Sequence, residues 1–269
     1  MYRQFYGLSK TPFTKDIPAS SVFSSRNLEE FLSRMEYFKT VRGIALVWGE
    51  PGTGKTTSMR TFIESLNLQT HMPVYLPLST LTVMDFYRHL ALGLGLLPRF
   101  RKVDLFHQVQ ERIASLSAQK AQIPVIILDE AQHLRNDLLH DLQMIFNFNM
   151  DSKNPAMVIL CGTPTIVPML RIHVHEGLFQ RVIVHHEFSG LGPDEADNYL
   201  KAMLRVAGSS SPIFTPDAAT AIFEASRGKP RLINALASKS LLIGAAREAR
   251  TIDSKIVQEA AMDALQLST

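Results

Sequence analysis

The stretch from Gly49 to Thr57 has the residue types and the spacing of a phosphate-binding loop. Its nine residues are Gly49, Glu50, Pro51, Gly52, Thr53, Gly54, Lys55, Thr56 and Thr57, which complete a G-x-x-x-x-G-K-[ST] motif. Gly52 and Gly54 let the backbone turn until successive N–H groups face phosphate oxygens. Lys55 can then reach the β- and γ-phosphates of a nucleotide, and Thr56 offers a hydroxyl to Mg²⁺. The stretch therefore predicts a nucleotide site.

A pair of carboxylates, Asp129 and Glu130, follows the apolar run 125–128. A wholly apolar run that ends in acids is typical of a buried parallel strand whose carboxyl end faces a ligand. Asp129 would hold Mg²⁺, directly or through water, and Glu130 would polarise the attacking water. The alternative interpretation is a plain strand-to-helix cap formed by Asp129.

Four other residues are candidates for contact with a phosphate. The apolar run 156–160 leads into Cys161 and Thr163, and a polar group at the end of this strand would touch the γ-phosphate or its water. Thr163 is the first candidate, Cys161 the second, and a loop-start threonine before a proline turn is the alternative. Arg181, before the predicted strand 182–188, could project into a neighbouring subunit or simply lie on the surface. Arg231 stands at a predicted helix start, where the helix dipole does not favour a cation, which indicates a functional arginine.

The elements around these residues predict an α/β region followed by an all-α region. Strands are expected at 44–48, 73–78, 125–128, 156–160 and 182–188. Helices are expected at 28–40, 57–66, 83–97, 104–119, 193–207, 216–226, 231–249 and 254–265. Residues 1–26 predict an ordered extended lead-in. The expected division is a linker and first helix (1–40), an α/β nucleotide-binding domain (41–190) and a helical domain (191–269).

Composition is that of an ordinary globular protein with a small positive charge. The 269 residues are 46% hydrophobic and 20% charged, and their net charge is +3. The single cysteine, Cys161, excludes an internal disulfide framework, and no apolar run approaches the length of a membrane span. With no signal-peptide pattern at the N-terminus, these features predict a cytoplasmic location.

The positive charge is concentrated near the N-terminus and in one connector. Residues 1–60 hold nine Lys and Arg against five Asp and Glu. The connector 98–102 carries Arg99, Arg101 and Lys102 around an aromatic residue. These cations could track DNA phosphates, although such a run is more often a solvated loop.

The motifs in this order resemble those of the ExeA/GspA-like family of AAA+ ATPases. The matching stretches are Tyr6-Gly7-Leu8-Ser9-Lys10-Thr11-Pro12-Phe13, Gly49 to Thr57, Asp129-Glu130-Ala131-Gln132, Gln180-Arg181, and Gly228-Lys229-Pro230-Arg231-Leu232-Ile233-Asn234. The resemblance implies a three-layer αβα P-loop domain with a parallel sheet in AAA+ order, followed by a small helical lid. It also implies Mg²⁺-dependent ATP hydrolysis, with Thr163 or Cys161 as sensor I, Arg181 as arginine finger and Arg231 as sensor II.

The family has two uses, and the chain is expected to follow the second. Secretion members resemble this module joined to a membrane span and a periplasmic region, whereas this sequence stops at Thr269, after the predicted lid. Stand-alone members resemble the transposon-encoded ATPases TnsC, TniB, IstB and MuB. The expectation is therefore a homo-oligomer that assembles on duplex DNA with ATP and recruits a transposase. The alternatives are a secretion or envelope ATPase that does not bind DNA, and a clamp-loader or replication-initiator ATPase.

Overall fold

The computed structural model describes residues 2–14, 18, 21–77, 82–119, 122–148, 153–209 and 211–265. Within them the chain divides into two compact units. The helical unit comprises Met1–Glu29, Pro51–Thr57 and Ser189–Thr269, and the sheet unit comprises Glu30–Glu50 and Ser58–Phe188. None of the helices in the described ranges is long and apolar enough to cross a membrane.

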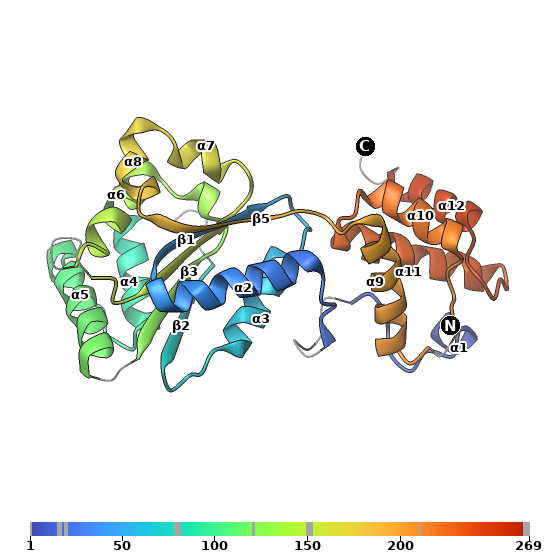
Figure 1. Ribbon diagram of the computed structural model, residues 1–269, viewed down its shortest axis with the longest axis horizontal. Coiled ribbons are helices and arrows are strands. Elements are labelled where there is room, and N and C mark those ends of the chain that lie inside the picture. The colour runs from blue at the N-terminus through green and yellow to red at the C-terminus, as the bar shows by residue number, and fades with distance from the viewer. Residues whose placement is uncertain are drawn as a thin grey trace. The chain divides into compact units, whose positions relative to one another are not determined.

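A five-stranded parallel sheet organises the sheet unit (Figure 1). Its strands are β1 (Gly43–Gly49), β2 (His71–Leu76), β3 (Ile123–Leu128), β4 (Met157–Gly162) and β5 (Val182–Phe188). The spatial order is β2-β3-β4-β1-β5, so the strand with the phosphate loop and the strand with the acidic pair lie on either side of β4. The expected α/β fold with a parallel sheet is confirmed. β2 begins two residues earlier than expected, and Leu78, its expected last residue, lies outside the described residues.

Helices flank the sheet because its central strands β1, β3 and β4 are apolar on both faces. The helices of this part are α2 (Arg26–Val41), α3 (Lys55–Ser65), α4 (Val83–Gly93), α5 (Lys102–Gln119), α6 (Asn136–Ile145), α7 (Ile166–Leu170) and α8 (Glu176–Phe179), with short 3₁₀ turns η2 (Ala131–His133) and η3 (His173–His175). The expected helix 83–97 is shorter than predicted, because Gly95 turns the chain with φ +74°. The sequence assigned no helix to α6, α7 or α8.

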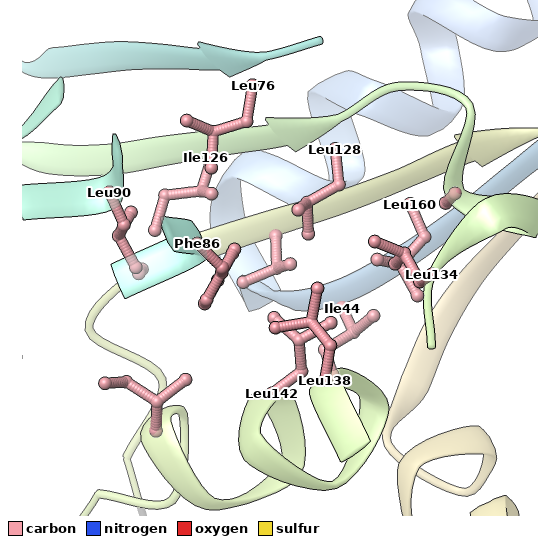
Figure 2. Close-up of a cluster of buried hydrophobic side chains, with 14 of the residues drawn as sticks. Ile44, Leu76, Phe86, Leu90, Ile126, Leu128, Leu134, Leu138, Leu142 and Leu160 are labelled. Atoms are coloured by element: carbon pink, nitrogen blue, oxygen red, sulfur yellow. The ribbon is translucent and has the colours of Figure 1, made fainter. Parts of the chain in front are cut away.

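One face of the sheet packs against α4, α5 and α6. Side chains of alternate strand residues point to this face, and Figure 2 shows them meeting leucines and a phenylalanine from α4 and α6. The labelled members of this cluster are Ile44, Leu76, Phe86, Leu90, Ile126, Leu128, Leu134, Leu138, Leu142 and Leu160. Each such buried side chain contributes roughly 1.5–3 kcal/mol, so this core fixes the strands whose ends carry the polar residues.

The helical unit has its own core and includes the N-terminal segment. Its helices are α1 (Tyr2–Phe5), α9 (Pro193–Val206), α10 (Pro216–Ser226), α11 (Pro230–Ala246) and α12 (Ser254–Leu265). Leu8 and Phe13 are buried among side chains of these helices, and the Tyr6 hydroxyl donates a hydrogen bond to the Ala249 carbonyl at 2.9 Å. Of the expected lead-in, residues 2–14 thus belong to the helical unit, and the expectation of an extended segment was wrong at residues 2–5, which form α1.

A buried histidine on the other face of the sheet makes stability depend on pH. The ring of His186 is 2% exposed and its centroid lies 5.4 Å from that of Phe31 and 4.6 Å from that of Phe188. Burial, and to a smaller extent the charge of Arg34, lower the pKa of His186 from 6.5 to about 4, while the charge of Glu30 opposes this shift. The unfolded chain therefore binds more protons than the folded chain between pH 6.5 and 4.

We expect the free energy of unfolding to decrease by about 3 kcal/mol through this residue as the pH falls from 6.5 to 4. Urea unfolding at several pH values would measure the free energy of unfolding, and its decrease towards low pH should be smaller in His186→Phe than in the wild type. Burial also lowers the pKa values of His175 and His185, so some decrease should remain. A pH profile as steep in His186→Phe as in the wild type would contradict the assignment.

Candidate nucleotide site

The phosphate-loop motif joins the end of β1 to the start of α3. Gly52 and Gly54 have φ angles of +87° and +105°, values that L side chains rarely adopt, so glycine is needed at both positions. No atom would lie within 4 Å of a Cβ at Gly54. Lys55 begins α3 with its side chain buried, whereas Thr56 and Thr57 are exposed. A turn of this kind at a helix N-terminus suits an anion.

Arg231 of α11 lies against this loop, within the helical unit. Its backbone N–H donates a hydrogen bond to the Gly52 carbonyl at 3.2 Å. The bond satisfies one of the N-terminal amides that a helix leaves without an internal partner. A Cβ on Gly52 would stand 2.8 Å from the Cβ of Arg231. The residue that the sequence singled out for its position at a helix start therefore contacts the phosphate loop.

The carboxyl ends of β1, β4 and β3 lie side by side in the sheet unit. Trp48 pairs with Gly162, and Leu128 pairs with Leu160. Because the strands are parallel, Gly49, Thr163 and Asp129 leave the sheet at the same edge. The structure thus places the beginning of the loop, the candidate sensor and the first acid next to one another along this edge.

Asp129 is buried and held by two hydrogen bonds. Its Oδ1 accepts from the Glu130 amide at 2.9 Å, and its Oδ2 accepts from the Tyr75 hydroxyl at 2.7 Å. Burial and this hydrogen bond raise the pKa of Tyr75 above its usual value, so Tyr75 is the proton donor. The N-cap position of η2 is occupied by Glu130, so the interpretation of Asp129 as a plain helix cap was wrong.

Glu130 adopts a strained backbone and is exposed. Its φ and ψ are 53° and 36°, a left-handed conformation that is costly for any residue with a Cβ and is often found at functional sites. One carboxylate oxygen accepts a hydrogen bond from Gln132, whose side chain also contacts the end of β4. Sequence reasoning gave no role to Tyr75 or Gln132, and Gln132 was visible only as part of the Asp129-Glu130-Ala131-Gln132 motif.

The two candidates for sensor I differ in position. Cys161 lies inside β4, paired with Val47, and is 1% exposed. Thr163 stands one residue beyond the end of β4 and is half-buried, and its hydroxyl is 2.7 Å from that of Thr165. Thr163 is therefore the better placed of the two to meet a ligand.

Arg181 lies at the opposite end of the sheet. It precedes β5, and the next residue, Val182, pairs with Ile44 at the amino end of β1. The Arg181 Nη1 donates to the Gln143 carbonyl at 2.7 Å. The length of β5 separates Arg181 from the carboxyl edge by about 20 Å at 3.3 Å per residue, which is further than an arginine side chain reaches.

The three cations of the connector are not equivalent. Lys102 is the first residue of α5, and its Nζ pairs with the buried carboxylate of Asp141 at 2.7 Å. Arg99 and Arg101 are exposed on either side of Phe100, which is 91% exposed. Lys102 therefore has a structural partner, and the two arginines remain as surface candidates.

Comparison with known proteins supports the fold and the nucleotide-binding class. Residues 39–170 match the family model described as AAA domain. General secretion pathway protein A of Aeromonas hydrophila is 33% identical over 257 residues, which are 94% of this chain and 46% of that protein. The chain thus spans about half the length of this curated relative.

Several solved structures share the fold at low sequence identity. Cdc6p from Pyrobaculum aerophilum has a TM-score of 0.71 and 16% identity, over 93% of this chain and 70% of that one. The Aeropyrum pernix ORC1 protein in complex with DNA has a TM-score of 0.66 and 19% identity, over 93% and 68%. The Thermotoga maritima RuvB Holliday junction branch migration motor has a TM-score of 0.53 and 20% identity, over 88% and 68%. The parallel sheet, the AAA-domain match and these neighbours give the chain the P-loop AAA+ fold, and with the Aeromonas relative they support an AAA+ ATPase of the ExeA/GspA-like kind.

Proposed function

We propose that the chain binds and hydrolyses ATP with Mg²⁺. The observation that carries this proposal is the shared carboxyl edge of β1, β4 and β3, where the phosphate-loop strand, Thr163 and the acidic pair emerge together. P-loop ATPases use these parts on one nucleotide. The loop amides and Lys55 would bind the phosphates, and Arg231 would contact them from α11.

The residues present fit a magnesium ion. The buried Asp129 carboxylate and the exposed Thr56 hydroxyl are the oxygen ligands that Mg²⁺ prefers. When bound, the ion would neutralise charge on the phosphate oxygens. Glu130, exposed beside the buried Asp129, would orient the attacking water and accept its proton. Thr163 would contact the γ-phosphate or that water.

We infer that the site is completed by a second copy of the chain. Arg181 lies about 20 Å from the carboxyl edge of its own sheet, so within one copy it does not serve that edge. In a ring or filament, an arginine from the neighbouring copy can stabilise the charge of the transferring phosphoryl group. An isolated copy would then bind ATP and hydrolyse it slowly.

For the biological role, we propose ATP-dependent assembly on duplex DNA that regulates transposition by recruiting an integrase-like transposase. The supporting observations are the exposure of Arg99 and Arg101 and the excess of cations among residues 1–60. A solved relative of the same fold was captured in complex with DNA. The second candidate, an accessory ATPase of a secretion complex, is favoured by the identity to general secretion pathway protein A.

Changing both Arg99 and Arg101 to alanine should weaken DNA binding and reduce the slope of log K against log salt by about 2, because two phosphate contacts are lost. ATP affinity should not change. Lys102→Met is the matched control: it should lower the unfolding temperature, since the buried Asp141 carboxylate loses its ion pair and keeps only the hydrogen bond from Tyr87, and it should leave the salt slope unchanged. Equal slopes in the wild type and the double variant would remove the connector from the DNA-binding surface.

The two roles are separated by imaging and filter retention of duplex DNA with ATP, ADP and a non-hydrolysable analogue at physiological salt. ATP-dependent rings or filaments on DNA would support the transposition role. Nucleotide-dependent assembly without DNA would favour the secretion role and leave the proposed ATPase activity standing.

A further inference from the structure

Gln132 bridges two of the candidate catalytic parts of the sheet unit. Its Nε2 donates a hydrogen bond to Glu130 Oε2 at 2.6 Å, and its Oε1 accepts one from the Thr163 backbone N–H at 3.0 Å. The orientation of the side-chain amide follows from its neighbours, because an N–H needs an acceptor and an ionised carboxylate needs a donor. One side chain therefore connects the end of β3 to the end of β4.

The close approach of Gln132 to β4 depends on a glycine. A Cβ on Gly162, the last residue of β4, would lie 2.6 Å from Gln132 Oε1 and 3.3 Å from the Gln132 backbone nitrogen. The left-handed backbone of Glu130 turns the chain at the end of β3 into η2 and so directs Gln132 towards Thr163. The strained backbone of Glu130 and the missing side chain of Gly162 are each locally unfavourable, and both are needed for the contact between Gln132 and Thr163.

We propose that Gln132 is a positioning residue for hydrolysis, which holds the Glu130 carboxylate and couples it to Thr163. This inference rests on the proposed ATPase function. The bond to Oε2 fixes the carboxylate plane and directs the other oxygen to the water. Because Thr163 stands where the γ-phosphate is expected, a ligand that shifts the Thr163 backbone also shifts the amide that holds Glu130. Gln132 would make the position of the general base depend on γ-phosphate occupancy.

Two variants separate the halves of the bridge. Gln132→Glu keeps an acceptor for the Thr163 N–H but removes the donor to Glu130, whereas Gln132→Met removes both. In the protein without nucleotide, hydrogen exchange of the Thr163 amide by NMR should accelerate about tenfold in Gln132→Met and stay near the wild-type rate in Gln132→Glu. This readout tests the contact without any turnover.

Single-turnover hydrolysis with enzyme in excess tests the coupling. In both variants the rate of the chemical step should fall roughly tenfold to hundredfold, because a badly positioned general base loses part of its rate enhancement. The Kd for a fluorescent ATP analogue should change less than about twofold. The unfolding temperature should stay near that of the wild type. Equal rates in wild type and Gln132→Met, or a loss of nucleotide affinity parallel to the loss of rate, would overturn the positioning role.

Glu130→Gln provides the floor for this experiment. If the wild type hydrolyses ATP no faster than Glu130→Gln, the proposed ATPase function itself fails. If the wild type hydrolyses ATP faster than Glu130→Gln and the Gln132 variants are as fast as the wild type, the ATPase function stands and only the role of Gln132 is excluded.

Discussion

Replacing Glu130 by glutamine should lower ATP turnover by about 10²- to 10⁴-fold, the range of a general base, with ATP affinity retained. An amide cannot accept the proton of the attacking water, but its carbonyl oxygen still accepts the hydrogen bond that Gln132 donates to this position. The variant therefore removes the base and keeps the local structure. Phosphate release at saturating ATP and analogue binding would be measured on the same preparation.

Glu224 offers a matched control for this change. It is an exposed glutamate of α10 in the helical unit, and Glu224→Gln should leave both turnover and affinity unchanged. Any ATP-dependent assembly should live longer with Glu130→Gln than with the wild type, because the nucleotide is not consumed. Wild-type turnover in Glu130→Gln would exclude Glu130 as the base.

Arg181→Ala should reduce turnover by about 10³- to 10⁵-fold, the effect typical of an arginine finger, while ATP still binds. The physical reason is the loss of the positive charge that, in the proposed assembly, would stabilise the transferring phosphoryl group in the neighbouring copy. The variant also loses the hydrogen bond to the Gln143 carbonyl, so its unfolding temperature must be measured beside its activity. Arg171, whose guanidinium lies 5.7 Å from the centroid of the Phe179 ring, is the control, and Arg171→Ala should stay active.

Mixing two inactive variants distinguishes a contribution in trans from one within a single copy. Arg181→Ala retains a working phosphate loop, and Lys55→Ala retains the arginine. In an equal mixture, about a quarter of the interfaces of a cyclic or helical assembly combine an intact loop with an intact arginine, so activity should reappear. A mixture as inactive as its components would contradict a site shared between copies.

The sequence predicted elements best where local signals mark both ends. The strand 182–188 and the helices 216–226 and 254–265 have the expected boundaries. For the helices the cause is a residue at the N-cap: Thr215 accepts from the Ala218 amide at 3.4 Å, and Asp253 accepts from the Ile256 amide at 3.0 Å. An N-cap side chain bonds to a backbone N–H only three residues further along, so the start of such a helix can be predicted from the local sequence.

Contacts between strands account for most of what the sequence did not predict. Tyr75 contacts Asp129 because β2 pairs with β3, and Gln132 contacts Thr163 because β3 pairs with β4. Neither contact has a local pattern. Lys102 is a similar case, since its partner Asp141 lies on α6, a helix that the sequence analysis did not assign. The phosphate loop is the opposite case, because its conformation follows from adjacent residues.

The contact between Arg231 and Gly52 would couple α11 to a nucleotide bound by the phosphate loop. The first turn of α11 shares a hydrogen bond with the loop that would carry the phosphates, so a ligand that orders the loop also changes the stability of that turn. By linkage, the coupling acts equally in both directions. If a protein binds α11 and shifts its first turn, it changes the affinity of the chain for ATP by a certain factor, and ATP changes the affinity of the chain for that protein by the same factor. A partner that binds the helical unit could therefore promote the binding or the release of ATP without contacting the nucleotide.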